Sequence, residues 1–511
     1  MNRRLARFFS FVGALAAVSS LPAQSPSPDA VIAAIVKGVA FFHEQAAVHG
    51  GYVYRTSRDG SLREAEGIPG PETIWIQPPG TPAVGEAFLD AWLATKDPAC
   101  LAAARDTGKA LALTQLHSGG WYYSGHFDAK GRSGASYRRA ADGTLIPDPP
   151  PESERTGKGG WSVWKTRRYE NNLSTLDDNV TQAALSFLIR LDLVEKGADE
   201  MVHDAVVQGL LSLIGTQAPN GGWATSYDRF PFPGGPPDVA LYPVLKASWP
   251  EDWPRTWPKD FTGCYVTNDH LQSTLLSTFL LAWKSYQEPR YLEVAKQAGA
   301  FLLDAQLPEP QPGWAQQYDA AMHPVWGRAF ECTAITSHES QSIMRVLIDL
   351  YRATQDARYL EPIPRAVTYF RKSLLPDGHL SRFYEPRTNR PVYFTRGPGG
   401  KGHVLTYEND KLASNYGFIR DSELDQIEAA YRAAKANAPA PVESPTGPAL
   451  DKLVRDILAG QDPSGAWITV GGMMRDASGK KTTPTGGVLE SEVFIDHVKA
   501  LTHWLKEKQA P

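Results

Sequence analysis

Acidic and amide side chains gather at two places where a helix is predicted to begin. The first segment is Ser174–Asn179 (STLDDN) and the second is Tyr265–His270 (YVTNDH), each followed by an apolar run. Carboxylate and amide oxygens suit a hard cation such as Ca²⁺. Since no continuous calcium-binding loop occurs, we expect a Ca²⁺ site assembled from separate helices. The candidate metal ligands are Asp177, Asp178, Asn268 and Asp269.

A structural role competes with this interpretation. Ser174 and Asp177 have the spacing of a capping box, in which a hydroxyl and an acid three residues on satisfy the first helix amides. A carboxylate there also interacts well with the helix dipole. Asp178 goes beyond what capping requires. Thr336–Glu339 (TSHE) starts a third predicted helix with the same spacing, and parallel inner helices would place all three starts on one rim.

Arginines separated by aromatic residues form the other candidate group. They lie in Trp326–Glu331 (WGRAFE) and in Ser381–Arg396 (SRFYEPRTNRPVYFTR). A guanidinium pairs with a carboxylate through two hydrogen bonds, so these segments suit a polymer that bears carboxylates. The alternative is a solvated surface with weak salt bridges, or a two-stranded hairpin with one wet face.

Helices must position these groups, and apolar residues recur at helical spacing along much of the chain. The predicted helices are Val31–Gln45, Trp92–Gln115 with a break at Pro98, Ser174–Val194, Asn268–Tyr286, Ser337–Thr354, Leu450–Gly460 and Leu489–Lys506. A glycine-rich turn ending in an aromatic residue follows several of them, as in Gln115…Gly119-Gly120-Trp121. The turn recurs around Tyr52, Trp223, Trp314 and Trp467.

This repetition predicts the fold class. Glycine permits the left-handed turn that ends a helix, and the aromatic residue can pack back on the helix pair. Copies at intervals of about two helices and their loops indicate helical hairpins arranged in a ring. We therefore expect a mainly α protein, an incomplete (α/α) toroid with long loops and a few short strands.

Composition excludes several classes. A net charge of −4 gives no indication of nucleic-acid binding. No segment is apolar enough for a membrane span. Phosphate-binding loops, zinc motifs and nucleophile elbows are also absent from the sequence. We expect a monomer.

The ends of the chain carry their own signals. Arg3, Arg4 and Arg7 precede the apolar run Phe8–Val18, and Leu21–Ala23 offers a cleavage site, so residues 1–23 are predicted to be a signal peptide. The protein would then be secreted or periplasmic. The expected domains are 24–433 for catalysis, a linker at 434–449 and a helical hairpin at 450–511. The three cysteines, Cys100, Cys264 and Cys332, do not make a disulfide framework, although two of them could pair.

Three segments, in this order, resemble the family 10 pectate lyases. They are Leu173–Gln182 (LSTLDDNVTQ), Gly313–Glu331 with its GWAQQYD and PVWGRAFE runs, and Ser381–Arg396. The resemblance covers roughly the middle of the chain. It implies an incomplete α/α toroid that cleaves polygalacturonate by Ca²⁺-assisted β-elimination. The chain departs from the family after Arg396, where Gly397–Gly400 (GPGG) stands in place of a turn with an acid.

The resemblance also implies roles for individual residues. Asp177 matches the calcium-associated acid, with Asp178 beside it, and Asn268 and Asp269 match the second acidic element. Arg328 matches the catalytic arginine base, which is unusual because a free guanidinium stays protonated. The expected substrate-binding residues are Arg382, Arg396, Tyr384 and Asn389.

Other functions stay open at this point. A glycoside hydrolase or an epimerase on an α/α toroid would use paired carboxylates without Ca²⁺. A non-catalytic glycan-binding relative would keep the groove without the base. A terpene-cyclase-like protein is disfavoured by the signal peptide and by the lack of a DxDD cluster.

Overall fold

The computed structural model describes residues 25–147, 170–228, 243–259, 265–414, 416–441 and 445–509. The predicted signal peptide, Cys264 and parts of the long loops and the linker lie outside these residues. The helices are α1 (Pro28–Ala46), α2 (Thr81–Thr95), α3 (Pro98–Leu113), α4 (Ala129–Ser133), α5 (Val180–Glu195), α6 (Glu200–Thr216), α7 (Leu271–Tyr286), α8 (Pro289–Asp304), α9 (Ser337–Thr354), α10 (Pro362–Lys372), α11 (Leu424–Lys435), α12 (Gly447–Gly460) and α13 (Ser491–Gln509).

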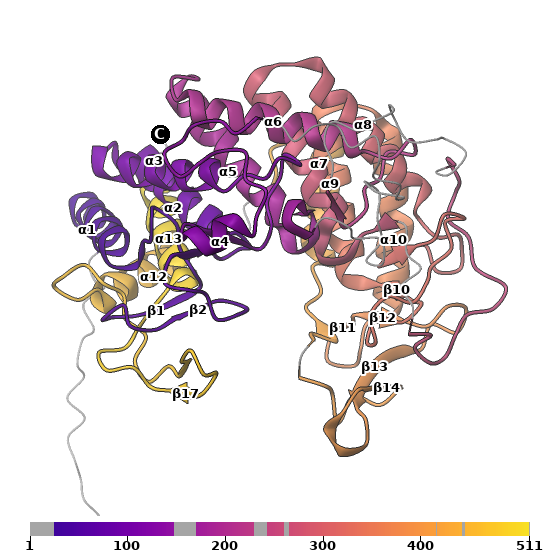
Figure 1. Cartoon of the computed structure of the whole chain (residues 1–511). Helices are drawn as coiled ribbons and strands as arrows, with labels where there is room; N and C mark the ends of the chain where they lie inside the picture. Colours follow the sequence, from indigo (N-terminus) through magenta and orange to yellow (C-terminus); the bar gives the residue numbers. More distant parts are fainter. Residues whose placement is uncertain are drawn as a thin grey trace, which may run out of the picture.

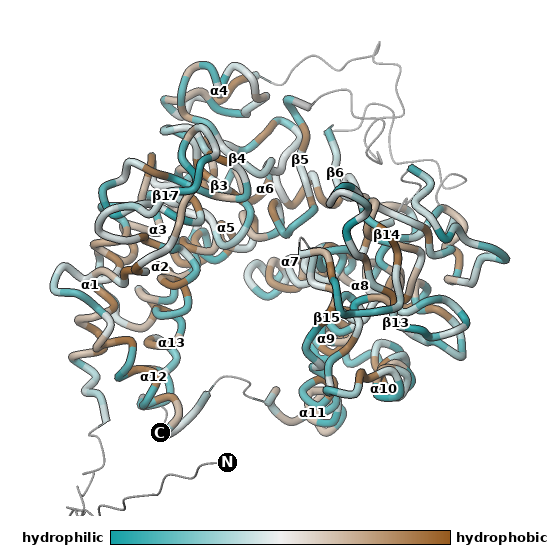
Figure 2. Tube along the Cα trace, turned by 90° about the horizontal axis from the view of Figure 1, so that it is seen from below, coloured by the Kyte–Doolittle hydropathy of each residue, from teal (hydrophilic) through white to brown (hydrophobic). Residues whose placement is uncertain are grey.

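These helices form an open ring of hairpins (Figure 1). On the inside, each helix contacts the next in the order α13, α2, α5, α7, α9 and α11. Their hairpin partners α12, α1, α3, α6, α8 and α10 lie outside them. Figure 2 shows that the ring is open between α11 and α12. The fold is an incomplete (α/α) toroid, as the sequence predicts.

The glycine–aromatic turns fasten each outer helix to the next inner one. The Trp223 indole donates to the Leu213 carbonyl near the end of α6, at 2.9 Å, and the Trp223 amide donates to the Gln272 side chain in α7. Gly221 has φ +92°, and a Cβ atom there would lie 2.1 Å from the Gln297 carbonyl oxygen, so glycine is required. The same indole bond runs from Trp121 to Leu111, from Trp314 to Leu302 and from Trp467 to Ile457.

A glutamine before each of these turns joins neighbouring outer helices. The Gln115 amide group donates at 2.8 Å both to the Gly119 carbonyl in its own turn and to the Ala205 carbonyl in α6. Equivalent pairs of bonds run from Gln217 to Gly221 and Val294, from Gln306 to Pro312 and Pro362, and from Gln461 to Gly465 and Ala34. The last pair ties α12 to α1, so the C-terminal hairpin uses the same link as the rest of the ring.

We expect Gln115→Ala to lower the free energy of unfolding by about 1–3 kcal/mol, because it leaves the buried Gly119 and Ala205 carbonyls without these donors. Denaturant unfolding measures the change. Gln297→Ala, at an exposed position in α8, is the matched control and should change stability little. Equal effects of the two substitutions would contradict the structural role of the glutamine.

Short strands lie at the inner helix starts and in the loops. They are β1 (Arg55–Ser57), β2 (Arg63–Glu64), β3 (Thr73–Trp75), β4 (Ser124–His126), β5 (Ser174–Thr175), β6 (Ser226–Tyr227), β7 (Tyr265–Val266), β8 (Trp314–Ala315), β9 (Gln317–Tyr318), β10 (Ile335–Thr336), β11 (Leu380–Ser381), β12 (Phe383–Tyr384), β13 (Pro391–Arg396), β14 (His403–Thr406), β15 (Ile419–Arg420), β16 (Met474–Arg475), β17 (Lys481–Thr482) and β18 (Val488–Glu490). The largest sheet has the order β14-β13-β12-β10-β8. Its register sets Ile335 opposite both Tyr384 and Ala315.

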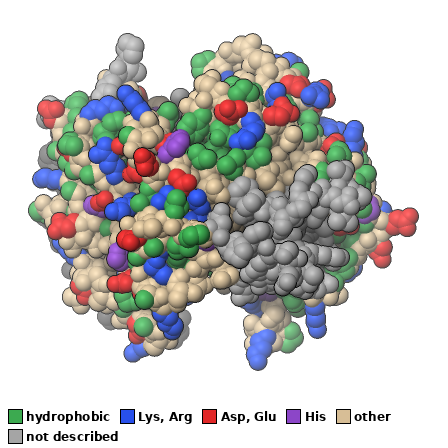
Figure 3. All heavy atoms as spheres, turned by 45° about the horizontal axis from the view of Figure 1, so that its top comes forward, with side chains coloured by type: hydrophobic (Ala, Val, Ile, Leu, Met, Phe, Trp, Pro, Cys, Tyr) green, Lys and Arg blue, Asp and Glu red, His purple; other side chains and the backbone are tan. Residues whose placement is uncertain are grey.

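The predicted helices overlap helices of the structure, and α9 matches Ser337–Thr354 at both ends. The prediction Trp92–Gln115, although it placed a break at Pro98, was wrong in treating the end of α2 and α3 as one helix, and α5 begins six residues after the predicted Ser174. The predicted two-stranded hairpin is β12–β13, with Phe383 opposite Val392. Cys100 and Cys332 are buried and free, so they do not pair with each other. Among the described helices, none combines the length and apolar character needed to cross a bilayer. On the face drawn in Figure 3, acidic and basic side chains are interspersed.

Candidate active site

Two matching turns carry the predicted metal ligands to one rim of the ring. In each, a short strand (β5 or β7) leads into a 3₁₀ turn, η3 (Asp177–Asn179) or η5 (Asn268–His270), before the inner helix begins. Asp178 and Asp269 have φ +49° and +48°, and the residue after each is also left-handed. Such conformations are uncommon outside glycine and concentrate at functional sites. The turns η3 and η5 contact each other.

The capping-box interpretation of the first turn is wrong. Ser174 lies in β5 opposite Tyr227, and its hydroxyl accepts from the Gly120 amide at 2.9 Å. The helix starts only at Val180, because the two left-handed residues interrupt the chain before it. Asp177 is therefore not the N3 acid of a helix, and its carboxylate is available for another role.

Asp177, Asp178 and Asp269 form the carboxylate cluster. One oxygen from each lies within 4.8 Å of the others. Burial, followed by the charges of Asp178 and Asp269, raises the pKa of Asp177 to about 7, and burial with Glu339 raises that of Asp269 to about 7. The Tyr123 hydroxyl donates to Asp178 at 3.1 Å. A hard divalent cation fits this set, since it would take carboxylate oxygens and offset their repulsion.

The carboxylate cluster makes stability depend on pH. Free aspartate has a pKa of about 3.9, so the folded protein, with Asp177 and Asp269 near 7, binds more protons than the unfolded chain between these values. Unfolding free energy therefore falls as pH rises through that window. In the presence of a chelator, the Tm of the wild-type protein should fall between pH 5.5 and pH 8. We expect this fall to be smaller in the Asp177→Asn variant.

The matched control for this measurement is Asp496→Asn, at an exposed position in α13, which should keep the wild-type profile. Added Ca²⁺ should raise the Tm of the wild-type protein most at pH 8, where the carboxylates are ionised. An Asp177→Asn protein with an unchanged pH profile would contradict the assignment.

Arg328 lies beside the carboxylate cluster, and Glu331 holds it there. The Arg328 guanidinium is 2.6 Å from one Glu331 oxygen, and its backbone amide donates to the other at 2.9 Å. Its Nη2 is 3.8 Å from Asp269. Burial opposes the charged guanidinium, yet Glu331 raises its pKa above the ordinary value. A Cβ atom at Gly327 would lie 2.9 Å from the Glu331 carboxylate, so a larger residue there would displace that side chain.

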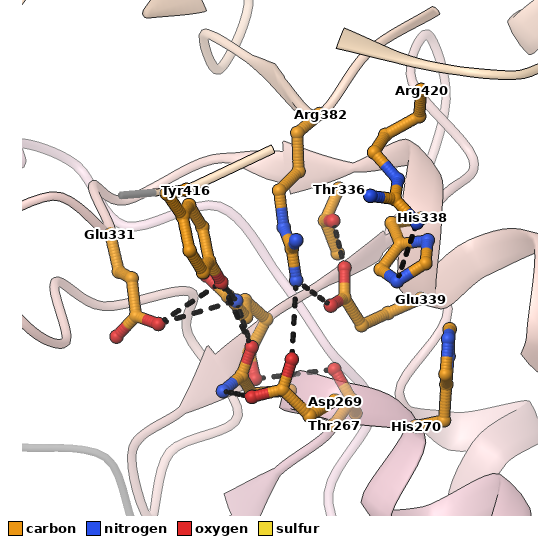
Figure 4. A network of polar contacts seen from close by, with 12 residues as sticks. Thr267, Asp269, His270, Glu331, Thr336, His338, Glu339, Arg382, Tyr416 and Arg420 are labelled. Atoms are coloured by element: carbon orange, nitrogen blue, oxygen red, sulfur yellow. Dashed lines mark hydrogen bonds and ion pairs between the residues drawn. The ribbon is translucent and has the colours of Figure 1, made fainter. Parts of the chain in front are cut away.

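Arg382 points toward Asp269 of the cluster and toward Glu339 (Figure 4). Its side chain is only 4% exposed, and its Nη2 lies 2.7 Å from Glu339 and 3.5 Å from Asp269. Burial alone would raise the pKa of Glu339, but Arg382 and two imidazoles lower it to about 2. The Thr336 hydroxyl also donates to this carboxylate, so the predicted third capping pair contributes a buried charge to the site.

Tyr416, Gln316 and Glu331 also belong to the site, although the sequence did not single them out. The Tyr416 ring lies 4.1 Å from the Arg382 guanidinium, and its hydroxyl is 3.2 Å from both Asn268 and Glu331. The Gln316 amide donates to this hydroxyl at 2.7 Å. Figure 4 shows Tyr416 between Glu331 and Arg382. Gln316 lies in the GWAQQYD run, the one signal that could have identified it.

Two histidines flank the cluster. The rings of His270 and His338 lie 4.2 Å apart, and the Arg420 guanidinium is 3.3 Å from His338. Burial lowers the pKa of both, that of His338 to about 3. They are therefore neutral near pH 7.

Three residues expected to bind substrate lie elsewhere. Tyr384 is fully buried and donates to the Ser373 carbonyl at 2.6 Å, and the Asn389 side chain bonds Tyr369 and Ser373. The fold therefore uses the polar atoms of both side chains. Arg396 is exposed at the end of β13, beside His403. Within the described residues, no hydrogen bond or ion pair connects any of the three to the carboxylate cluster.

Comparisons with known proteins find similarity at the level of solved structures. No family model and no curated protein matches the chain. A mutant family 10 polysaccharide lyase from Cellvibrio cellulosa, in complex with trigalacturonic acid, is 16% identical over 69% of this chain and 98% of its own, with a TM-score of 0.42. A cellobiose 2-epimerase from Spirochaeta thermophila is 14% identical over 94% and 97%, with a TM-score of 0.46.

An inactive α-1,6-mannanase variant from Salegentibacter, in complex with α-1,6-mannotriose, is 10% identical over 94% of this chain and 100% of its own, with a TM-score of 0.39. These proteins carry out different reactions, and likeness of this degree does not choose between them.

Proposed function

We propose that this protein is a lyase that cleaves an acidic polysaccharide, with polygalacturonate as the expected substrate, by β-elimination at the rim of the ring. The observation that carries the proposal is the meeting of three carboxylates with Arg328 and Arg382. The Asp269 carboxylate lies 3.8 Å from the Arg328 guanidinium and 3.5 Å from the Arg382 guanidinium. Oxygen ligands and guanidinium groups side by side suit a substrate that bears carboxylates.

Elimination breaks the C5–H and C4–O4 bonds and forms a C4–C5 double bond. The C5 proton, α to the uronate carboxylate, passes to a base, and the leaving O4 takes up a proton from water. A divalent cation held by Asp177, Asp178 and Asp269 would, when bound, stabilise the negative charge that develops at the uronate carboxylate. The Asn268 amide nitrogen donates to Asp269 at 2.5 Å, while its oxygen accepts from Gln316 and Tyr416. Asn268 would therefore orient the Asp269 carboxylate and would not itself bind the cation.

We propose Arg328 as the base. To accept the C5 proton, its guanidinium must first lose a proton. Glu331 and Asp177 raise its pKa, so both favour the charged guanidinium. Neutralising the charge of Asp177 and Asp178 would lower the pKa of Arg328, and a lower pKa would make the neutral, proton-accepting form easier to reach. While charged, Arg328 can still pair with the uronate carboxylate and help acidify the C5 proton. Arg382 is held by Glu339 and would act as a fixed cation at the rim.

The test follows ultraviolet absorbance, because elimination leaves a conjugated double bond. We expect polygalacturonate incubated with the protein and Ca²⁺ to gain this absorbance, and a chelator to abolish the gain. Absence of the chromophore with every uronate polymer tried would contradict the proposal. The protein is also proposed to act outside the cytoplasm, on the basis of the signal peptide predicted at residues 1–23.

A glycoside hydrolase is the second candidate, and the pKa of Asp177 favours it. A buried carboxylic acid with a pKa of about 7 beside a second carboxylate can serve as a general acid. This alternative predicts release of reducing ends without the chromophore and without dependence on Ca²⁺. The same incubation therefore separates the two reactions.

A further inference from the structure

A pocket beside the rim has the character of a sugar-binding site. It lies between β3, β4, α4 and the segment before β5, and its volume is about 660 Å³. Small-molecule sites typically have volumes of about 300–1,000 Å³. Its lining includes Tyr122, Ser124, His126, Lys130, Tyr137 and Asn171.

The polar groups of this pocket are held in place for hydrogen bonding. The two ring nitrogens of His126 lie 3.2 Å from the Thr73 hydroxyl and 3.2 Å from the Ser124 hydroxyl. Burial lowers the pKa of His126, so the ring is neutral near pH 7. Tyr122 presents an aromatic side chain that is 39% exposed. A flat ring with hydroxyl groups beside it matches a pyranose, which has apolar faces and a polar edge.

One lysine places a cation in the lining of the pocket. Lys130 is exposed on α4 and lines the pocket. Asp128 also lines the pocket, and its carboxylate accepts from the Gly131 amide at 2.8 Å as the cap of α4. Among the described lining residues, the Lys130 ammonium group is the cation that a bound uronate carboxylate would meet.

Two connections join the pocket to the carboxylate cluster. The Tyr122 ring packs at 5.3 Å on the ring of Tyr123, whose hydroxyl donates to Asp178. Asn171 and Leu173 line the pocket immediately before β5, the strand that leads into Asp177. A polymer lying along Tyr122 and Tyr123 would thus reach both places.

We propose that this pocket is a distal subsite, which binds one uronate unit of the polymer beyond the units at the carboxylate cluster. The inference rests on the proposed function for its substrate class. Binding energy gained away from the reacting bond should act on KM more than on kcat, because ground state and transition state share it.

The test measures steady-state kinetics on oligogalacturonates of increasing length. We expect Tyr122→Ala and Lys130→Ala each to raise KM about fivefold for long oligomers, with kcat unchanged, and to leave the shortest cleavable oligomer unaffected. Tyr122→Phe should keep most of the affinity, because it keeps the ring. Lys109→Ala, at an exposed position in α3, is the charge-matched control. Equal KM values for the variants and the wild-type protein at every length would overturn the subsite.

Failure of the proposed function can be distinguished from failure of the subsite. If no uronate polymer is cleaved, calorimetric titration of the same oligogalacturonates into the wild-type protein and the Tyr122→Ala variant still tests the pocket. Binding that weakens in the variant supports the subsite without the lyase reaction. Absence of binding, or equal binding by both proteins, overturns it.

Discussion

Replacing Arg328 with alanine should lower kcat/KM on polygalacturonate by about 10²–10⁴-fold, the range typical of a lost proton-transfer group. The side chain lies against Asp269 and is 37% exposed, so it is both near the carboxylate cluster and reachable by substrate. Initial rates of double-bond formation over a range of substrate concentrations measure the loss. A fall in kcat, more than a rise in KM, is expected if Arg328 acts on the transition state.

Controls separate this effect from a change of fold. Glu331 keeps hydrogen-bond contacts with Tyr416 and with the backbone amide of residue 328 in the variant, so the carboxylate does not lose every partner. Arg105→Ala removes an arginine from an outer ion pair with Glu195 and should leave the rate unchanged. Arg328→Lys keeps a cation with a lower pKa. Its pH–rate profile should shift to lower pH if the residue accepts the proton, and activity within a few-fold of wild type in Arg328→Ala would exclude that role.

The ring itself could be predicted from the sequence because its signals are local. An apolar stripe in the sequence predicts an inner helix. Glycine followed by tryptophan marks the turn at the end of the outer helix that precedes the next inner helix. Gln115 and Trp121 were identified as parts of one repeated turn, and the structure shows that each bonds a different helix. Their partners, Ala205 and Leu111, carry no signal of their own, since only a backbone carbonyl takes part in each bond.

The carboxylate cluster could be predicted in part for the same reason. Asp178 and Asp269 stand before apolar runs, and their placement on one rim follows from parallel inner helices. The left-handed turns could not be predicted, because the Ser-x-x-Asp pattern also fits a capping box. A tertiary contact decides between the two structures, because the Ser174 hydroxyl accepts a hydrogen bond from the Gly120 amide of the preceding repeat.

The arginine segment shows where sequence patterns fail. Alternation of arginine and aromatic residues in Ser381–Glu385 suggested one wet face, yet all five residues are buried. β12 is only two residues long and lies between β10 and β13 in the sheet, so neither of its faces is exposed to solvent. Tyr416 was missed because its partners Asn268 and Gln316 lie about 100 residues or more away in the chain.

Replacing Arg382 with alanine should destabilise the protein by about 3–5 kcal/mol, the usual result of breaking a buried ion pair. Glu339 is 0% exposed. Burial raises its pKa, and Arg382, with smaller contributions from His338, His270 and Thr336, lowers it to about 2. In the variant this carboxylate must either stay charged without its partner or take up a proton. Urea unfolding at neutral pH measures the loss, and Arg371→Ala, in an exposed ion pair with Asp425, should cost little by comparison.

A second substitution tests the cause of that loss. Arg382→Ala combined with Glu339→Gln removes the buried charge along with its partner, so it should recover part of the stability. The coupling energy of the double-mutant cycle isolates the ion pair.

The pH dependence of stability is an independent test of the ion pair. A carboxyl group with a folded pKa near 2 stabilises the wild-type protein above its unfolded pKa of about 4.3, and this contribution disappears as pH falls towards 2. Arg382→Ala should lose that dependence, whereas an unchanged acid limb would mean that the three remaining neighbours, Thr336, His270 and His338, suffice to hold the charge.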